Sequence, residues 1–213
     1  MKAPLEPTSD CPLCPRLAAF RHDNRKKHPD WFNAPVPCFG PRSARLAIAG
    51  LAPGLQGANR TGRPFTGDWA GDLLYDSLLK LKLAKGTYEE RADDTLELID
   101  CRIVNSVRCV PPQNKPEPSE IKTCRQFLIS ELDNMPNLTT ILALGKIAHD
   151  SVLKTLDARI SAHPFKHGGV YEIGKFRLIS SYHCSRYNTN TGVLTTEMFE
   201  TVVAKAKKLA AIA

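Results

Sequence analysis

The sequence lacks several features that would place it in a familiar class of protein. No apolar run reaches the roughly 18 residues that a membrane-spanning helix needs. The first twelve residues, MKAPLEPTSDCP, have no apolar centre of the kind found in secretory signals. No internal repeat and no low-complexity tract occurs. We therefore expect a cytoplasmic protein with no membrane partner, and its 213 residues, 42% of them hydrophobic, are enough to form a substantial core.

Common nucleotide-binding and hydrolase motifs are missing as well. The glycine-rich stretch GLAPGLQGANRTGRPFTGD, residues 50–68, is neither a GxGxxG fingerprint nor a P-loop, because no GK[ST] follows it. No G-x-S-x-G nucleophile elbow occurs. A hydrolase of small esters or amides, using Ser185 or Ser106 with His183, is kept only as a third alternative, because this motif is missing.

The chain carries an excess of basic residues. Its 29 Lys and Arg residues outnumber its 22 Asp and Glu residues, which gives a formal net charge of +7. Such a charge suits a polyanionic partner such as nucleic acid but does not require one. Residues 1–44 are rich in Pro, Lys, Arg and His and show little strand pattern. We expect them to form a basic N-terminal arm, and residues 45–213 to form the core of one compact domain.

Seven cysteines without an export signal indicate metal binding or catalysis rather than a disulfide framework. Cys11 and Cys14 form a C-x2-C pair before the core, and Cys109 and Cys124 form a second, wider pair. Two pairs from distant parts of the chain could meet and supply four thiolates. Zinc and a 4Fe–4S cluster both accept such a set, so the spacing leaves the metal open. Cys101, inside an apolar run, is interpreted as a buried thiol.

From residue 45 onward, short apolar runs alternate with segments whose apolar residues recur at helical spacing. This alternation is typical of a three-layer α/β/α sandwich around a mainly parallel central sheet. We expect Ser119 to cap the second predicted helix and Thr195 or Thr196 to cap the last. The predicted strands cover residues 44–50, 99–107, 139–145, 169–174 and 175–183, and the predicted helices cover residues 71–84, 118–132, 146–156 and 195–213.

Polar residues and glycines gather directly after three of the predicted strands. Because ligands bind at the carboxyl ends of parallel strands, these loops predict a single pocket. Asp68 stands at a helix start, as an N-cap or a site carboxylate. Phe65 is either a stacking aromatic or a loop aromatic tucked into the core. Asn114 offers both a donor and an acceptor for a base edge, and His183 ends the last strand, close to Ser185.

Three of these segments resemble the uracil-DNA glycosylase superfamily, and most of all its family 5, the type B enzymes of bacteria and archaea. The matching stretches are GLAPGLQGANRTGRPFTGD, VNSVRCVPPQNKP and YHCSRYNTNTGVLT. The resemblance runs from about Cys11 to the final helix. It implies a monofunctional enzyme that flips uracil out of DNA and hydrolyses its bond to the sugar, leaving an abasic site. It also implies excision of other deaminated bases such as hypoxanthine.

The resemblance selects iron–sulfur over zinc for the paired cysteines. It implies a 4Fe–4S cluster held by Cys11, Cys14, Cys109 and Cys124. We expect a structural role for this cluster, because it would tie the N-terminal arm to the loop that carries Asn114. The implied partner is DNA containing uracil or other deaminated bases, bound by a monomer. We expect the basic surface, including Arg21, Arg25, Lys26 and Lys27 of the arm, to contact the DNA phosphates.

The resemblance also implies roles within the predicted pocket. Phe65 is expected to stack on the flipped base, and Asn114 to hydrogen-bond its edge. His183 is expected to reach the O2 atom of the pyrimidine, while Asp68 orients water or stabilises the cationic sugar. The free backbone N–H groups of the first turn would line the pocket. The substrate-binding residues implied besides Phe65 are Gly50, Leu51, Ala52, Pro53, Gly54, Asn59 and Ser185.

Three positions bear on substrate range and efficiency. Leu51 follows the type B pattern, where related families carry an acidic or amide residue, and a pocket with fewer fixed polar groups fits a broader range. Cys184 stands where the second motif usually has proline, and Trp69 stands where a smaller residue is commoner. A non-catalytic iron–sulfur or zinc module that binds nucleic acid is kept as the second alternative.

Overall fold

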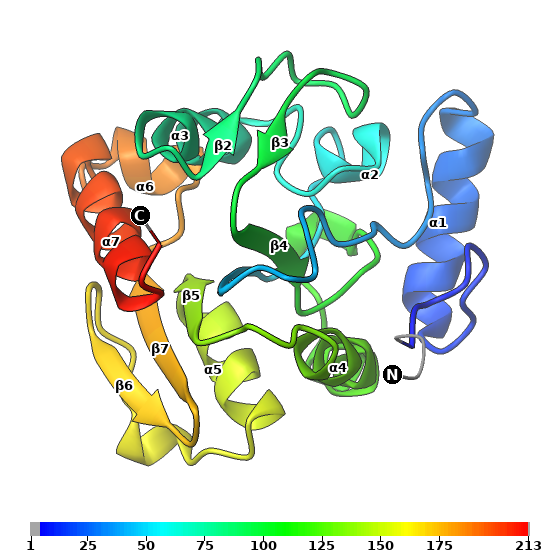
Figure 1. The fold of residues 1–213 in the computed structure, drawn as a ribbon. Coiled ribbons are helices and arrows are strands. Elements are labelled where there is room, and N and C mark those ends of the chain that lie inside the picture. Colours follow the sequence, from blue (N-terminus) through cyan, green and yellow to red (C-terminus); the bar gives the residue numbers. More distant parts are fainter. Residues whose placement is uncertain (1–4, 213) are drawn as a thin grey trace.

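The computed structural model describes residues 5–212, which form a five-stranded, mainly parallel sheet covered by helices (Figure 1). The strand order is β4-β1-β5-β7-β6, and β2 and β3 form a separate two-stranded ribbon. The strands are β1 (Leu46–Gly50), β2 (Ala84–Lys85), β3 (Glu97–Leu98), β4 (Cys101–Asn105), β5 (Thr140–Leu144), β6 (Val170–Ile173) and β7 (Phe176–Ser181). The helices are α1 (Pro15–Lys27), α2 (Ala58–Thr61), α3 (Trp69–Lys80), α4 (Pro118–Asp133), α5 (Lys146–Thr155), α6 (Arg186–Asn190) and α7 (Thr196–Leu209), with 3-10 turns η1 (Pro112–Asn114) and η2 (Ile160–Ala162).

The strand pairing fixes where the functional loops emerge. Strand β1 pairs parallel with both β4 and β5, β7 lies parallel beside β5, and β6 pairs antiparallel with β7. Every residue of β1, β4 and β5 is buried, as expected for parallel strands covered on both faces. The four parallel strands therefore end at one edge of the sheet, after Gly50, Asn105, Leu144 and Ser181.

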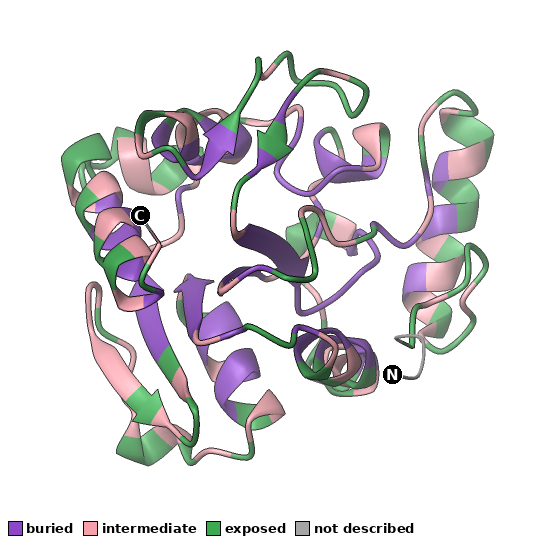
Figure 2. Cartoon of the chain, viewed as in Figure 1, coloured by how far each residue is buried: buried purple, intermediate pink, exposed green. Residues whose placement is uncertain are grey.

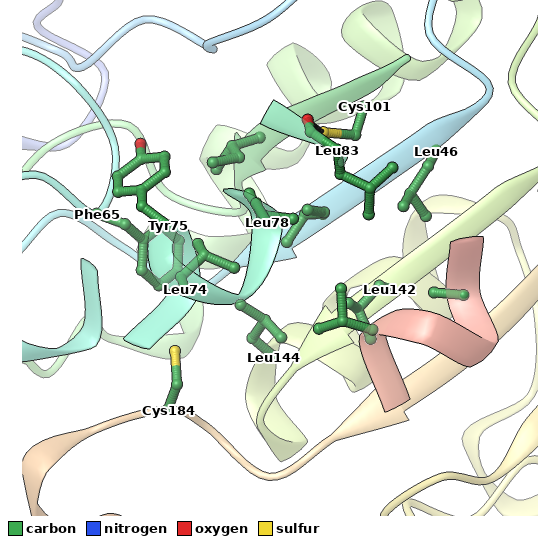
Figure 3. Packing of buried hydrophobic residues seen from close by; sticks show 14 of the residues in the cluster. Leu46, Phe65, Leu74, Tyr75, Leu78, Leu83, Cys101, Leu142, Leu144 and Cys184 are labelled. Atoms are coloured by element: carbon green, nitrogen blue, oxygen red, sulfur yellow. Dashed lines mark hydrogen bonds between the residues drawn. The ribbon is translucent and has the colours of Figure 1, made fainter. Parts of the chain in front are cut away.

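Alternate residues of the strands enter two hydrophobic layers. Leu46 and Ile48 of β1 pack with side chains of α3 and α7, whereas Ala47 and Ala49 pack with side chains of α4 and α5. Figure 2 shows β4 and β5 buried beneath the more exposed helices. Figure 3 shows part of the first layer, with Leu74 of α3 among the strand leucines. Helices on both faces confirm the predicted three-layer α/β/α sandwich.

The N-terminal arm is folded against the core. Helix α1 stands at one side of the molecule (Figure 1), and its Leu17 packs beside Cys109. Further along the arm, Phe39 lies against β4. The N–H group of Phe39 donates to the carbonyl of Ile103 (3.0 Å), and the N–H group of Ile103 donates back (2.8 Å). The division of the chain after residue 44 stays a prediction.

The first predicted helix is shorter than expected. We predicted a helix over residues 71–84, but α3 ends at Lys80. Ala84 instead pairs with Leu98 in the β2–β3 ribbon. The apolar residues after Lys80 continue the helical spacing because they still face the core, although the chain has left the helix.

The predicted start of α4 was wrong by two residues. Its N-cap is Glu117, not Ser119, because Pro118 takes the first helical position, which suits its fixed φ and missing N–H. The N–H group of Glu117 donates to Glu120 Oε2 at 2.7 Å, which completes a capping box. Thr195 caps α7, as one of the two predicted alternatives. None of the helices within residues 5–212 is both long and apolar enough to cross a membrane.

Candidate active site

A cavity of about 420 Å³ opens at the carboxyl edge of the sheet. Its walls come from the segments that follow β1, β4 and β7, as the strand order predicts. The lining residues are Leu51, Ala52, Pro53, Gly54, Phe65, Asp68, Trp69, Ala70, Asn105, Asn114, His183, Ser185 and Arg186.

Asp68 is both the N-cap of α3 and part of the cavity wall. Its Oδ1 atom accepts from the N–H group of Gly71 at 3.2 Å. Its Oδ2 atom lies where Gly57 leaves room for it, since a Cβ atom on Gly57 would stand 2.3 Å away. Burial raises the pKa of the Asp68 carboxyl above its ordinary value, and the N–H groups that it accepts from oppose that rise. The two interpretations of Asp68 from the sequence are therefore compatible.

Phe65 is held at the floor of the cavity by its unusual backbone. Its φ angle is +52°, in the left-handed region, and the residue is 9% exposed. The Tyr75 hydroxyl donates to the carbonyl of Pro64 at 2.5 Å, which fixes the chain just before it. The ring lies against Gly50, where a Cβ atom would come within 2.9 Å of it. Gly50 does not itself line the cavity but makes this close approach possible.

His183 lies across the cavity from Phe65. The two ring centroids are 6.1 Å apart, and their planes are 28° from parallel. Burial lowers the pKa of His183 below its ordinary value, which favours a neutral imidazole at neutral pH. The carbonyl of His183 accepts from Asn188 Nδ2 at 2.8 Å, and Ser185 caps α6 by accepting from the N–H group of Asn188. Hydrogen bonds between residues close in the sequence therefore fix the conformation of the segment after β7.

Cys184 is fully buried between His183 and Ser185. It joins the hydrophobic layer that contains Phe65 and Leu74 (Figure 3). Burial raises the pKa of its thiol to about 12. The cysteine therefore occupies the usual proline position as a small apolar side chain.

Two asparagines contribute amide groups to the cavity. Asn114, one of the predicted residues, is exposed, with a φ angle of +56°. Asn105 was missed by the sequence reasoning. It is 5% exposed, and its Oδ1 atom has no hydrogen-bond partner among the described residues. The signal was an asparagine that closes the apolar run of a predicted strand, at the edge where the pocket was expected.

The first turn after β1 presents free donors to the cavity. Neither Ala52 nor Gly54 donates a backbone N–H hydrogen bond within the described part of the chain. Pro53 between them has no N–H group. The turn can therefore offer N–H groups to a ligand, as its glycine pattern predicted.

Asn59 is a second predicted residue, after Gly50, that does not line the cavity. Asn59 is 1% exposed, and its Nδ2 atom donates to Asn33 Oδ1 at 2.9 Å. That contact links α2 to the N-terminal arm. The cavity wall gains Trp69 and Arg186 instead; Trp69 Nε1 donates to Thr189 Oγ1 at 2.9 Å.

The serine hydrolase alternative finds no support in the geometry. Ser106 is buried, and its hydroxyl donates to the carbonyl of Gly50 at 3.1 Å. Ser185 is engaged as the cap of α6. Within residues 5–212 neither hydroxyl hydrogen-bonds to His183.

The four paired cysteines lie together on the far side of the turn that lines the cavity. Cys109 and Cys124 are buried with Leu17, and Cys11 and Cys14 pack against the same cluster. All four are free thiols and line one hollow. Among the described residues, no group of three or more His, Cys, Asp or Glu side chains has the arrangement of a site for a single metal ion.

Burial affects how these thiols would ionise. It raises the pKa of Cys14 to about 11 and that of Cys124 to about 12, and it also raises the pKa of Cys109. The thiols of Cys14, Cys109 and Cys124 would therefore stay protonated at neutral pH unless a metal drew off the protons. Sulfur here also accepts hydrogen bonds, because the N–H group of Arg108 donates to Cys124 Sγ at 3.3 Å.

Comparison with known proteins shows which family the chain is similar to. The Uracil DNA glycosylase superfamily matches residues 37–207, a range that contains every cavity-lining residue. A type-5 uracil-DNA glycosylase of Thermus thermophilus is 45% identical over 95% of this chain and 94% of its own. A second, from Pyrobaculum aerophilum, is 38% identical over 92% of this chain and 88% of its own. A type-4 uracil-DNA glycosylase of Archaeoglobus fulgidus is 30% identical over 70% of this chain and 69% of its own.

Proposed function

This chain belongs to the uracil-DNA glycosylase superfamily, and from that premise we propose how its cavity releases uracil from DNA. The chain is an enzyme of the glycosylase class, which removes the non-catalytic binding module as an alternative. The target base has to leave the duplex, at a cost of a few kcal/mol that is smallest for a mismatched base. The cavity then holds the flipped base between Phe65 and the first turn.

The Oδ1 atom of Asn105, buried and without a hydrogen-bond partner among the described residues, is the observation that carries this proposal. A buried acceptor without a partner is costly, so a ligand that pairs with this amide gains the full value of the contact. Uracil presents an acceptor at O4 and a donor at N3–H, which match the NH2 group and the oxygen of one amide. Cytosine presents the opposite pair, which this orientation of the amide would leave unpaired. In that orientation, Asn105 distinguishes uracil from cytosine.

The same logic extends to hypoxanthine, the finer part of the proposal. Its O6 and N1–H groups repeat the acceptor and donor order of uracil, so one amide orientation serves both bases. Leu51 adds no polar group that would reject a purine. The cavity of about 420 Å³ has the size of a pocket for a base with its sugar. We therefore include hypoxanthine among the substrates.

Bond cleavage is assigned to groups on two sides of the sugar bond. As the bond between the base nitrogen and the sugar carbon breaks, its electron pair leaves with the base, and the sugar becomes cationic. The neutral His183 imidazole and the N–H groups of Ala52 and Gly54 stabilise the charge on the base. The Asp68 carboxylate stabilises the sugar cation and accepts a proton from the water that attacks the sugar carbon. This attack leaves an abasic site in the DNA. Asn114 is assigned to hydrogen-bonding at the mouth of the cavity.

The four paired cysteines are assigned to a 4Fe–4S cluster. The four thiols lining one hollow and the N–H donor on Cys124 Sγ suit a thiolate cluster. Cys11 and Cys14 belong to the arm, while Cys109 and Cys124 flank the loop that carries Asn114. A cluster held by these four residues would cross-link the arm to that loop. The monomeric state and the cytoplasmic location stay predictions.

The test is cleavage of labelled duplexes that carry a single uracil, hypoxanthine, thymine or cytosine, followed by hot alkali. We expect alkali-dependent breaks at uracil and hypoxanthine and none at the normal bases. Asn105→Ala should slow uracil release about 10- to 100-fold, since two hydrogen bonds are lost. Asn137→Ala, which alters an exposed asparagine away from the cavity, is the matched control. Equal rates for both variants would remove Asn105 from base reading, and an inactive wild type would overturn the proposal.

A further inference from the structure

Arg21, which we expected on the surface that contacts DNA phosphates, is instead a buried cation beside the paired cysteines. It lies on α1 and is 4% exposed. Its Nη1 atom donates to Cys109 Sγ at 3.4 Å, and its Nη2 atom donates to the carbonyl of Cys11 at 3.0 Å. Among the residues that the structure describes, no Asp or Glu oxygen comes within ion-pair distance of it. Both of these hydrogen bonds go to cysteines that line the same hollow as Arg21.

Other buried arginines of the chain differ from Arg21 in this respect. Arg63, Arg102 and Arg108 each pair with a carboxylate, at 2.6, 2.5 and 2.7 Å respectively. A guanidinium taken out of water costs several kcal/mol unless an anion compensates it. The arm also has exposed positions for a basic residue, because Lys26 on the same helix faces solvent. A buried Arg21 therefore calls for an anion inside the hollow.

We propose that Arg21 is the counter-charge of the iron–sulfur cluster, and that it tunes and protects that cluster. This inference rests on the proposed cofactor. Four thiolates around the cluster leave the site with net negative charge, which the protein must balance in a buried place. Hydrogen bonds to the sulfurs and nearby charge are among the factors that set the reduction potential of such clusters. Arg21 supplies both, and the N–H group of Arg108 on Cys124 Sγ supplies a second hydrogen bond.

The charge of Arg21 should be visible in the potential. A cation beside the cluster stabilises the reduced form, which carries one more negative charge than the oxidised form. Removing that cation should therefore shift the midpoint potential to a more negative value. It should also expose Cys109 Sγ to exchange, so that the cluster is lost faster to oxidants or chelators.

The experiment compares the wild type with Arg21→Gln, Arg21→Lys and Lys26→Gln in the full-length protein. Arg21→Gln replaces the guanidinium by an uncharged N–H donor, whereas Arg21→Lys keeps the charge. Lys26→Gln removes a charge at an exposed site of the same helix. The readouts are iron and sulfide content, visible absorbance during exposure to a chelator, and the midpoint potential. We expect Arg21→Gln to have a more negative potential and several-fold faster loss of absorbance. Arg21→Lys should lie near the wild type, and Lys26→Gln should equal it.

The possible outcomes separate this inference from the proposed function. A wild type with iron and sulfide, whose potential and cluster loss are the same in Arg21→Gln, would overturn the role of Arg21 alone. A wild type that contains zinc or no metal would overturn the cofactor and this inference together. If Arg21→Gln does not fold, Arg21→Lys tests the charge argument. Because this variant keeps the charge, a midpoint potential clearly more negative than that of the wild type would contradict the argument. Uracil release is measured separately, so its presence or absence does not bear on these readouts.

Discussion

At the scale of single residues, Asp68 combines two roles that make opposite demands on its surroundings. The N-cap of α3 needs an acceptor oxygen, which the Asp68 side chain provides to Gly71. The proposed chemistry needs an ionised carboxylate, yet burial against Gly54 and Gly57 raises its pKa. An ionised Asp68 in this poorly solvated position therefore lowers the stability of the fold, while it provides the charge that the proposed chemistry needs.

Asp68→Asn should be more stable and much less active. Asparagine caps a helix about as well as aspartate, so the cap survives. A carboxyl whose folded pKa is raised stabilises the fold below its unfolded pKa, and this contribution is lost as pH rises through the folded pKa. The variant should thus melt at a higher temperature than the wild type at neutral pH, with the gain vanishing in acid. Uracil release in single turnovers should fall about 100- to 10,000-fold.

Asp76→Asn, on the exposed face of the same helix, is the control for Asp68→Asn. It should change neither the rate nor the pH dependence of the melting temperature. Wild-type turnover by Asp68→Asn would exclude the carboxylate from the mechanism.

Gly57→Ala should lower activity by displacing the carboxylate. The new Cβ atom would stand 2.3 Å from Asp68 Oδ2, so the side chain has to move. A displacement on the order of 1 Å can cost about 100-fold in rate. Gly54→Ala, whose Cβ atom would stand 2.9 Å from the same oxygen, should have a smaller effect. Single-turnover rates measure this order, and an equal or reversed order would show that the glycines do not position Asp68.

At the scale of elements, the segment around Phe65 is clamped from outside by the β2–β3 ribbon. Arg63 stacks near the rings of Phe39, Tyr75 and Tyr88 and forms a bidentate pair with Asp94, between β2 and β3. The Arg63 guanidinium and the Asp94 carboxylate are both buried. The ribbon thus fixes the loop that carries the stacking aromatic without touching the cavity.

Asp94→Asn should unfold more easily in a pH-dependent way. Burial opposes ionisation of Asp94, but Arg63 and the backbone N–H groups of Glu89 and Leu96 outweigh it and lower the pKa to about 2. A depressed folded pKa gives stability that is present above the ordinary value and lost as pH falls through the folded value. The variant should lose about 3 kcal/mol in urea unfolding at neutral pH, because Arg63 is left unpaired.

The difference between Asp94→Asn and the wild type should shrink as pH falls from about 4 towards 2. Asp93→Asn changes an exposed neighbouring carboxylate and should show no such dependence. A pH-independent loss in Asp94→Asn would mean that the neutral hydrogen bonds, not the charge, hold the clamp.

Trp69 joins the start of α3 to α6 at the rim of the cavity. Its indole N–H donates to Thr189, and the Arg186 guanidinium lies 5.9 Å from the centre of its ring. Trp69→Phe keeps the ring and removes one hydrogen bond, whose net value is about 1 kcal/mol. We expect the free energy of unfolding, measured in urea, to fall by about 1 kcal/mol, because both partners of this bond lie within the protein. Trp31→Phe is the control at the other tryptophan, and an unchanged stability of Trp69→Phe would contradict the link.

The sequence predicted the sheet and the edge that carries the cavity, because apolar runs and helical spacing are determined by burial. It did not predict α1, α2 or α6. The four and five residues of α2 and α6 are too few to show a periodic pattern, and α1 carries no clear apolar face among its charged residues. Ser119 was chosen as a cap from residue type alone, whereas Pro118 fixes the first helical position.

Sequence reasoning named cavity-lining residues that stand in loops and missed Asn105 in β4 and Arg186 in α6. Asp68, Phe65 and His183 are conspicuous among glycines and polar neighbours. Asn105 closes a buried strand, and which way its side chain faces depends on pairing that the sequence does not display. Asn59 shows the opposite failure, because it belongs to the same motif but is oriented toward the arm.

At the scale of the whole molecule, the net charge of +7 determines how the enzyme meets DNA. Affinity for duplex DNA should fall about 100-fold between roughly 50 and 200 mM salt if about four phosphates are contacted. A duplex without uracil should give the same slope at lower affinity, since the phosphates carry no base information. Fluorescence anisotropy at several salt concentrations measures both slopes. Binding that is independent of salt would rule out this electrostatic contribution.

The contact between Phe39 and Ile103 has a further consequence for the behaviour of the protein in concentrated solution. Strand β4 is the last strand on its side of the sheet, and such a strand invites a second molecule to extend it. The paired N–H and carbonyl groups of Phe39 occupy part of that edge. The basic N-terminal arm therefore also hinders the pairing of β4 with the same strand of a second molecule. Removing the arm should make the protein aggregate more readily.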